Sequence, residues 1–245
     1  GSLTTSDALV SNMNKQKSTS FIFNNRLYII DGKNYLVFDG EKITTVEADA
    51  YIPTTYINII PSGENADNGT EHEQRNILSP YFKHTFIADG TTKEFLMNDN
   101  NLEAIKEVKA YGQTVSSSAY TVDLAKGKIT FSEAPKKPEE AGNYPEFYAG
   151  IEITAKKPIT TLSGITDDDV EINNIITSCS IATIYDNRVF LSGNPKYPNH
   201  IFFCGRNTTG YFDPSYFGIL NYMQDGVGAT PITGLIPVAD TLMAL

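Results

Sequence analysis

The sequence predicts an all-β protein made of short antiparallel strands, and three observations support this prediction. Short apolar runs are separated by Asn, Asp and Gly turns, and the aromatic residues are 14 Tyr and 13 Phe with no Trp. Tyr and Phe favour strands, and these turn residues favour tight hairpins. The chain has 245 residues, 40% of them apolar, which supports a substantial core in one large domain or two modest ones.

Four strands are predicted directly after the polar first 18 residues. They are Phe21–Phe23, Leu27–Ile30, Tyr35–Phe38 and Ile43–Val46, with turns at Asn24-Asn25, Asp31-Gly32 and Asp39-Gly40. Apolar side chains occupy both odd and even strand positions, whereas a sheet with one wet face alternates apolar and polar residues. The pattern therefore predicts a meander stacked between two neighbouring sheets, as in a blade of a β-propeller.

A second copy of this pattern begins 162 residues further along the chain. Phe23-Asn24-Asn25-Arg26-Leu27-Tyr28-Ile29 recurs as Tyr185-Asp186-Asn187-Arg188-Val189-Phe190-Leu191, and each copy precedes an apolar strand ending at Gly40 or Gly205. Repeated strand and turn chemistry indicates repeated blades. The alternative is a coincidence between two unrelated hairpins.

Residues 84–157 are predicted to form a separate module between Pro80 and Pro158. Their strands do alternate polar and apolar residues, and six or seven short strands predict a small β-sandwich. We expect this module to fold alone if it is excised.

The expected architecture is an incomplete propeller interrupted by this sandwich, with propeller-like parts at 1–83 and 158–245. Without the insert about 170 residues remain, or three to four blades of roughly 40–50 residues, and closed propellers usually have four to eight. The apolar end at Leu245 leads us to expect a fragment of a longer protein and an open arc of sheets. One helix is expected after Thr166-Asp167-Asp168-Asp169, which has capping-box spacing.

Charge and composition exclude several classes of function. The net charge of −10 repels phosphate backbones and argues against non-specific nucleic-acid binding. No apolar run reaches the roughly 18 residues of a membrane span. Cys179 and Cys204 lie in apolar surroundings without CxxC spacing, so we expect two buried free thiols.

The sequence contains no recognisable catalytic or metal-binding motif, so we predict that the protein is not an enzyme and binds no cofactor and no metal. His72, His84 and His200 are isolated, and Glu71-His72-Glu73 fits a solvated loop better than a metal site. Asp167-Asp168-Asp169 lacks the spacing of a calcium loop and fits helix capping. Nucleophile elbows, P-loops and dinucleotide fingerprints are missing from the sequence. Carboxylate pairs for glycoside hydrolysis are tertiary features, so a propeller glycosidase is the third alternative.

One aromatic-rich segment is the candidate interaction surface. It contains Tyr211, Phe212, Tyr216, Phe217 and Tyr222 among Gly and Pro residues. Tyr and Phe on a surface can contact a protein or a sugar, and the alternative is burial within a blade.

Residues 25–40, the Asp186–Pro195 stretch with Tyr197-Pro198-Asn199, and Tyr211-Phe212-Asp213-Pro214 resemble structural proteins of tailed bacteriophages and prophages. The 84–157 module resembles the immunoglobulin-like inserts of phage tail and baseplate proteins. The resemblance implies a non-catalytic virion protein of the tail or head–tail connector, made in the bacterial cytoplasm. Its implied partners are other virion proteins or further copies in a ring. A carbohydrate-binding or surface-adhesion β protein is the runner-up.

Overall fold

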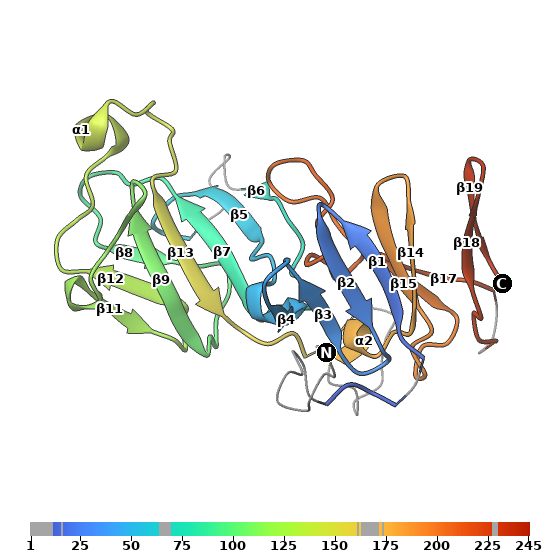
Figure 1. Cartoon of the computed structure of the whole chain (residues 1–245). Coiled ribbons are helices and arrows are strands. Elements are labelled where there is room, and N and C mark those ends of the chain that lie inside the picture. The colour runs from blue at the N-terminus through green and yellow to red at the C-terminus, as the bar shows by residue number, and fades with distance from the viewer. Residues whose placement is uncertain are drawn as a thin grey trace. The chain divides into compact units, whose positions relative to one another are not determined.

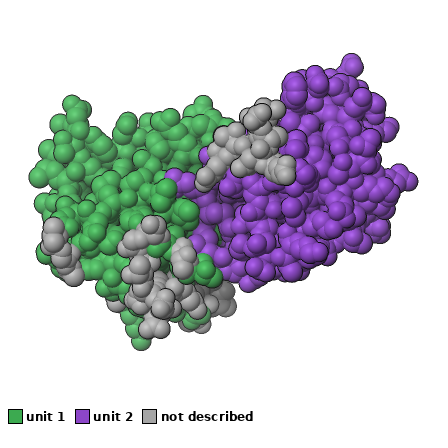
Figure 2. Space-filling view, turned by 180° about the vertical axis from the view of Figure 1, so that it is seen from behind, with its two compact units in different colours: residues 1–51, 77–79, 160–245 green, residues 52–76, 80–159 purple. Residues whose placement is uncertain are grey.

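A computed structural model describes residues 12–15, 17–63, 70–160, 162, 172, 174–226 and 230–245. The chain divides into two compact units (Figure 2). Unit 1 comprises residues 1–51, 77–79 and 160–245, and unit 2 comprises residues 52–76 and 80–159. The all-β prediction is confirmed: the described residues form several largely antiparallel sheets, none of which closes on itself.

Unit 1 contains two four-stranded antiparallel meanders and a hairpin. The first meander consists of β1 (Thr19–Phe23), β2 (Arg26–Ile30), β3 (Tyr35–Phe38) and β4 (Ile43–Thr45). The second consists of β14 (Ile181–Tyr185), β15 (Arg188–Ser192), β16 (His200–Phe203) and β17 (Tyr222–Gln224). The hairpin is β18 (Leu235–Val238) with β19 (Thr241–Ala244). The 3-10 helix η2 (Val46–Asp49) and the helix α2 (Asn174–Thr177) complete the regular elements of this unit.

The two copies of the sequence repeat form equivalent hairpins at the start of the two meanders. Phe23 pairs with Arg26, and Tyr185 pairs with Arg188. The turn residues have left-handed φ angles of 47° and 60° at Asn24 and Asn25, and 48° and 56° at Asp186 and Asn187. Two successive left-handed residues define the turn that matches the twist of a hairpin, and Asn and Asp tolerate that conformation.

The second meander is packed against a neighbouring element on each face, although its last strand, β17, is largely exposed. Figure 1 shows β14 and β15 between β1 and the β18–β19 hairpin, and β14 contacts both neighbours. On one side, Thr19 Oγ1 donates a hydrogen bond to the Ser180 carbonyl over 2.9 Å. On the other side, Phe190 and Ile201 form a cluster with Ile232 and Leu235.

The first meander is not buried on both of its faces, contrary to the prediction from the sequence. Tyr28, Ile30 and Tyr35 are buried on one face, where Tyr35 Oη donates to the Pro214 carbonyl over 3.1 Å. On the opposite face Ile22 is 70% exposed and Leu27 is half-buried. Neighbouring sheets therefore cover more of the second meander than of the first.

Unit 2 consists of two sheets that enclose one core. The larger sheet has the strand order β10-β9-β13-β7-β5-β6, in which only β5 and β7 are parallel. Its strands are β5 (Thr54–Ile59), β6 (Thr70–Glu71), β7 (Tyr81–Phe86), β9 (Ala104–Ala110), β10 (Gln113–Thr114) and β13 (Ile151–Lys156). The smaller sheet contains β8 (Glu94–Leu96), β11 (Tyr120–Asp123) and β12 (Lys128–Phe131). The core between the sheets includes Ile59, Phe82, Phe86, Phe95, Val108, Ile129, Phe131, Ile151 and Ile153.

Unit 2 extends beyond the expected module boundaries of 84–157. The strand β7 begins at Tyr81 and pairs with β5, which starts at Thr54. The side chain of Ile59 on β5 is fully buried in the core of unit 2. The strand β5, which lies before Pro80 in the sequence, therefore belongs to unit 2, while residues 77–79 belong to unit 1.

The short helices agree with the sequence expectation only in part: α2 lies within the segment expected to be helical and buries Ile175 and Ile176. The capping run Thr166–Asp169 lies outside the described residues, and the helix α2 covers only Asn174–Thr177. An unexpected helix, α1 (Pro138–Gly142), follows the strands of the smaller sheet, and a 3-10 helix, η3 (Ser117–Ala119), precedes β11. Pro138 occupies the first turn of α1 with Glu139 and Glu140, which are favourable residues at a helix start.

Candidate functional site

The aromatic segment predicted as a contact surface is divided between the surface and the core. Tyr211 is 74% exposed, and Phe212 is half-buried. Tyr216 and Phe217 are only 4% and 0% exposed, so they pack rather than present a surface. Tyr222 on β17 is half-buried and contacts other aromatic rings of the second meander. Of the five residues, Tyr211 is the most exposed, and the half-buried Phe212 lies next to it in the sequence.

Burial of Tyr216 and Phe217 has a clear cause. The ring of Phe217 packs edge-on against Tyr35, with 6.4 Å between centroids. The ring of Tyr216 lies 5.1 Å from that of Tyr51. These residues join the first meander and its following segment to the loop after β16, so they serve the core of unit 1.

Tyr211 and Phe212 line a cavity of about 480 Å³ that we call the turn pocket. Its remaining lining residues come from both repeat hairpins and the loop after β16: Ile22, Phe23, Asn24, Ile184, Asp186, Asn187, Arg206 and Gly210. The two turns that the repeat predicts thus lie at one cavity. The volume falls within the roughly 300–1,000 Å³ typical of small-molecule sites.

The polar groups of the turn pocket are not engaged with other described residues. The side chains of Asn24, Asp186 and Asn187 make no hydrogen bond or ion pair within the part of the chain that the structure describes. The Arg206 guanidinium lies 4.7 Å from the centre of the Phe212 ring, a cation–π contact that positions it without neutralising it. These groups are therefore available to a ligand.

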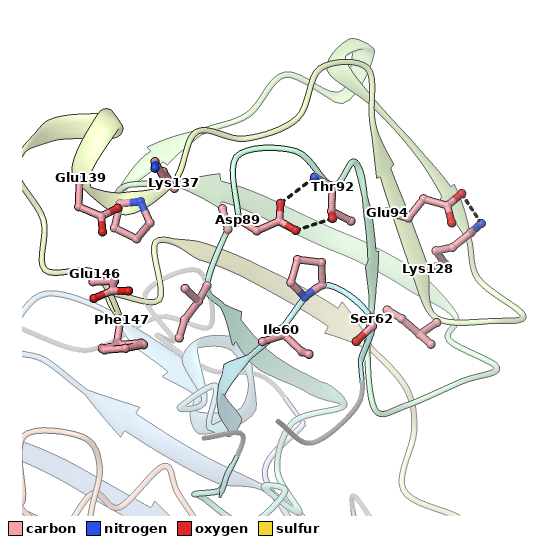
Figure 3. Close-up of a pocket in the computed structure, with 15 residues that line it drawn as sticks. Ile60, Ser62, Asp89, Thr92, Glu94, Lys128, Lys137, Glu139, Glu146 and Phe147 are labelled. Atoms are coloured by element: carbon pink, nitrogen blue, oxygen red, sulfur yellow. Dashed lines mark hydrogen bonds and ion pairs between the residues drawn. The ribbon is translucent and has the colours of Figure 1, made fainter. Parts of the chain in front are cut away.

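A second cavity, which we call the sandwich pocket, occupies about 690 Å³ of unit 2 (Figure 3). Its apolar lining comes from Ile60, Pro61, Ile87, Ala88, Leu96, Pro138 and Phe147. Figure 3 shows Glu139, Glu146 and Phe147 on one side, Glu94 with Lys128 on the other, and Asp89 between them. An apolar floor with a charged rim is a common form of binding site.

Several charges of the sandwich pocket are already compensated. Partial burial of Asp89 opposes its ionisation, but hydrogen bonds from Thr92 and Thr91 hold its pKa at about 2. Glu94 Oε1 lies 2.7 Å from Lys128 Nζ. Glu139 and Glu146 form no ion pair with any described residue. The rim therefore keeps two uncompensated carboxylates beside the exposed Phe147 ring.

The histidines do not converge on a metal site. His84 is fully buried in unit 2, His200 is buried in unit 1, and His72 is exposed. Within the described ranges, no group of three or more His, Cys, Asp or Glu side chains could hold a metal ion. The side chain of Glu71 and the Asp167–Asp169 run lie outside those ranges, so the prediction that no metal binds there stays a prediction.

The expectation of two buried free thiols is confirmed. Cys179 and Cys204 are both buried and unpaired with each other. Burial raises the pKa of the Cys179 thiol far above its usual range, and burial also raises that of Cys204 to about 11. Because the thiolate is the nucleophile, neither residue is suited to covalent catalysis.

The repeat turns can be recognised in the sequence as structural features, but the pocket that they share cannot, because it forms only when the two meanders pack together. The sequence around Arg206 contains no motif that marks it as a pocket residue, because its position depends on the fold of the loop after β16. Phe147 lies in the aromatic run Tyr144-Pro145-Glu146-Phe147-Tyr148, which could have indicated a second exposed aromatic surface.

No protein-family model, curated protein or solved structure matches the chain. Among the described residues, no helix is long and apolar enough to cross a membrane.

Proposed function

We propose that this chain is a non-catalytic structural protein of a tailed-phage or prophage virion that acts through protein–protein contacts in the tail or head–tail region. In this proposal the meanders of unit 1 are propeller-like blades and unit 2 is an immunoglobulin-like insert. The observation that carries the proposal is the apolar outer face of the β18–β19 hairpin.

The two faces of this hairpin differ in their surroundings. Leu235, Leu242 and Ala244 pack toward the cluster on the second meander. Ile236, Val238 and Met243 point to the opposite face and are 45%, 48% and 45% exposed. Ile236 pairs directly with Met243 across the hairpin, so these side chains form one continuous apolar surface. Exposed apolar surface of this kind marks a contact site for another protein.

The packing of the inner face of the same hairpin supports sheet stacking as the form of such a contact. The second meander is covered on one side by this hairpin and on the other by the first meander, so stacking of small sheets is the packing principle of unit 1. A further sheet from a virion partner, or from another copy in a ring, would continue the same stacking. The sandwich pocket gives unit 2 an additional place for an apolar or cationic side chain of a partner.

The state of two carboxylates of the sandwich pocket, Asp89 and Glu94, supports a non-catalytic role for that pocket. The Asp89 carboxylate accepts hydrogen bonds within its own turn, and Glu94 pairs with Lys128, so both groups stay ionised. A glycosidase needs one carboxyl group that can give up a proton at neutral pH. Hydrolysis of aryl glycosides that is lost on replacing one carboxylate pair would contradict this part of the proposal.

Genetic complementation tests the virion role. A phage lacking this gene is supplied with the wild-type chain or with the double variant Ile236→Lys, Met243→Lys, and infectious particles are counted. We expect wild type to restore particles and the double variant to arrest assembly, because two charges would be buried in the contact. Val122→Lys, on the exposed side of β11, is the matched control and should restore them. Absence of the protein from purified particles by mass spectrometry would refute the proposal.

A further inference from the structure

We infer that the turn pocket of unit 1 binds a saccharide, with the Tyr211 ring as a stacking surface and the polar side chains of the two repeat turns as hydrogen-bonding partners for hydroxyl groups. This site is separate from the hairpin surface on which the proposed function rests.

The chemistry of the lining matches neutral, hydroxyl-rich ligands. Each sugar hydroxyl both donates and accepts hydrogen bonds, and an Asn side chain offers a donor and an acceptor on one plane. Asn24 and Asn187 supply two such amides, Asp186 supplies a carboxylate acceptor, and Arg206 supplies guanidinium donors. The single negative and single positive charge balance within the pocket, which gives no preference for a strongly charged ligand.

The repeat fixes the backbone positions from which these polar side chains extend before a ligand arrives. Asn24, Asp186 and Asn187 all have left-handed φ angles within tight hairpin turns. A two-residue turn between paired strands has little conformational freedom, so ordering it on binding costs little. Because the two copies have the same turn geometry, they present their polar side chains to one cavity from two stacked sheets.

Tyr211 supplies the apolar contact that a sugar ring requires. Its side chain is 74% exposed although it lines the cavity, so the ring is accessible to a ligand that stacks on it. The adjacent Gly210 has a φ of +82° and no atom near the position of a Cβ, which leaves the approach to the ring open. The C–H face of a pyranose can therefore stack on Tyr211 while its hydroxyl groups reach the turns.

Saturation-transfer NMR on the full chain tests this inference. The probes are the methyl glycosides of glucose, galactose, mannose, rhamnose and N-acetylglucosamine. Inorganic phosphate has no C–H protons, so its binding is followed separately by phosphorus NMR line broadening. We expect at least one glycoside to receive saturation at its ring C–H protons. Tyr211→Ala should weaken its binding about tenfold through loss of the stacking contact. Asp186→Asn should also weaken binding, and Asn retains the left-handed turn.

Two control variants distinguish a local effect from a general one. Met223→Ala removes another exposed apolar side chain of unit 1, and Asp240→Asn makes the same chemical change in a different hairpin turn. Both should bind the glycoside as wild type does. The inference is overturned if no glycoside receives saturation, if binding is unchanged in both pocket variants, or if phosphate alone binds at Arg206. None of these results bears on assembly through the β18–β19 hairpin, so the two proposals fail independently.

Discussion

His84 Nε2 lies 3.7 Å from Asp99 Oδ2, yet neither ring nitrogen of His84 has a hydrogen-bond partner. The separation is too long for a hydrogen bond, and the imidazole is enclosed by the rings of Tyr56 and Phe82 at about 5 Å. Burial in these surroundings lowers the pKa of His84 to about 4, against a smaller opposing effect of the Asp99 carboxylate. Unit 2 thus holds a neutral imidazole in an apolar core.

This histidine predicts a pH-dependent stability for unit 2. Between pH 6.5 and about 4 the unfolded chain binds a proton at this residue that the folded chain excludes, so the free energy of unfolding falls as pH is lowered through that window. The shift from 6.5 to about 4 corresponds to about 3 kcal/mol over the window. Urea denaturation across this pH range measures the effect.

His84→Phe should remove most of that pH dependence, since Phe fits an aromatic core and does not titrate in this range. His72→Gln changes an exposed histidine and should leave the pH profile as in wild type. A wild-type profile in His84→Phe would show that other groups control the acid stability.

Excision should reveal the true boundary of unit 2. A fragment of residues 52–159 retains β5, β7 and the complete core, so we expect dispersed amide signals in its NMR spectrum. A fragment of residues 84–157 lacks Ile59 and Phe82, both fully buried, and removes half of β7. We expect this shorter fragment to give a random-coil spectrum. A folded 84–157 fragment would mean that β5 is dispensable.

Gly150 should not tolerate a side chain, because a Cβ at this position would collide with the ring of Tyr111. That ring stacks on Tyr144, with 5.1 Å between centroids, and Tyr144 stacks on Tyr148 at 4.5 Å. We expect Gly150→Ala to lower the free energy of unfolding by about 1–3 kcal/mol and to reduce the near-ultraviolet circular dichroism of the tyrosines.

Gly234→Ala is the matched control, because the added Cβ would lie at an ordinary contact distance of 3.6 Å from Leu245 Cδ1. Its stability should stay close to that of wild type. Equal losses in the two variants would contradict a specific role for the tyrosine stack.

The arginines at the same position of the two repeats should respond differently to substitution. Arg188 Nε donates to the Cys204 carbonyl over 2.7 Å while its guanidinium lies 4.1 Å from the centre of the Phe203 ring. A lysine cannot make both contacts, so Arg188→Lys should cost about 1–2 kcal/mol of unfolding free energy. Arg26 is exposed, and Arg26→Lys should change stability by less than about 0.5 kcal/mol. Thermal denaturation of both variants decides the comparison.

The parts of the fold that local chemistry determines could be predicted from the sequence. The strands β1 to β4 and the repeat hairpins lie where turn residues such as Asn24 and Asn25 placed them, because a two-residue turn fixes both the ends and the register of its strands. The helix α1 was not predicted, although Pro138 and the acidic first turn are local signals of a helix start. These signals lie within a segment that has no apolar periodicity.

Long-range pairing accounts for the parts that could not be predicted. The strands β5 and β7 pair in parallel and are not joined by a tight turn. The sequence pattern therefore gave no reason to group the residues of β5 with unit 2. Likewise, Tyr211 and Tyr216 are five positions apart in one aromatic segment, but only Tyr216 is packed against Tyr51. Burial of an aromatic residue in such a loop depends on tertiary neighbours that composition does not reveal.

The distance in sequence between the two meanders has a consequence for synthesis of the chain on the ribosome. Thr19 bonds to Ser180, 161 residues later, and Tyr35 bonds to Pro214, 179 residues later. At about 5–20 residues per second, the nascent first meander waits roughly ten to thirty seconds before its partner emerges. Unit 2 is translated during this interval. The nascent first meander therefore exposes Tyr28, Ile30 and Tyr35 to chaperones, and slower elongation through the insert should lengthen that exposure.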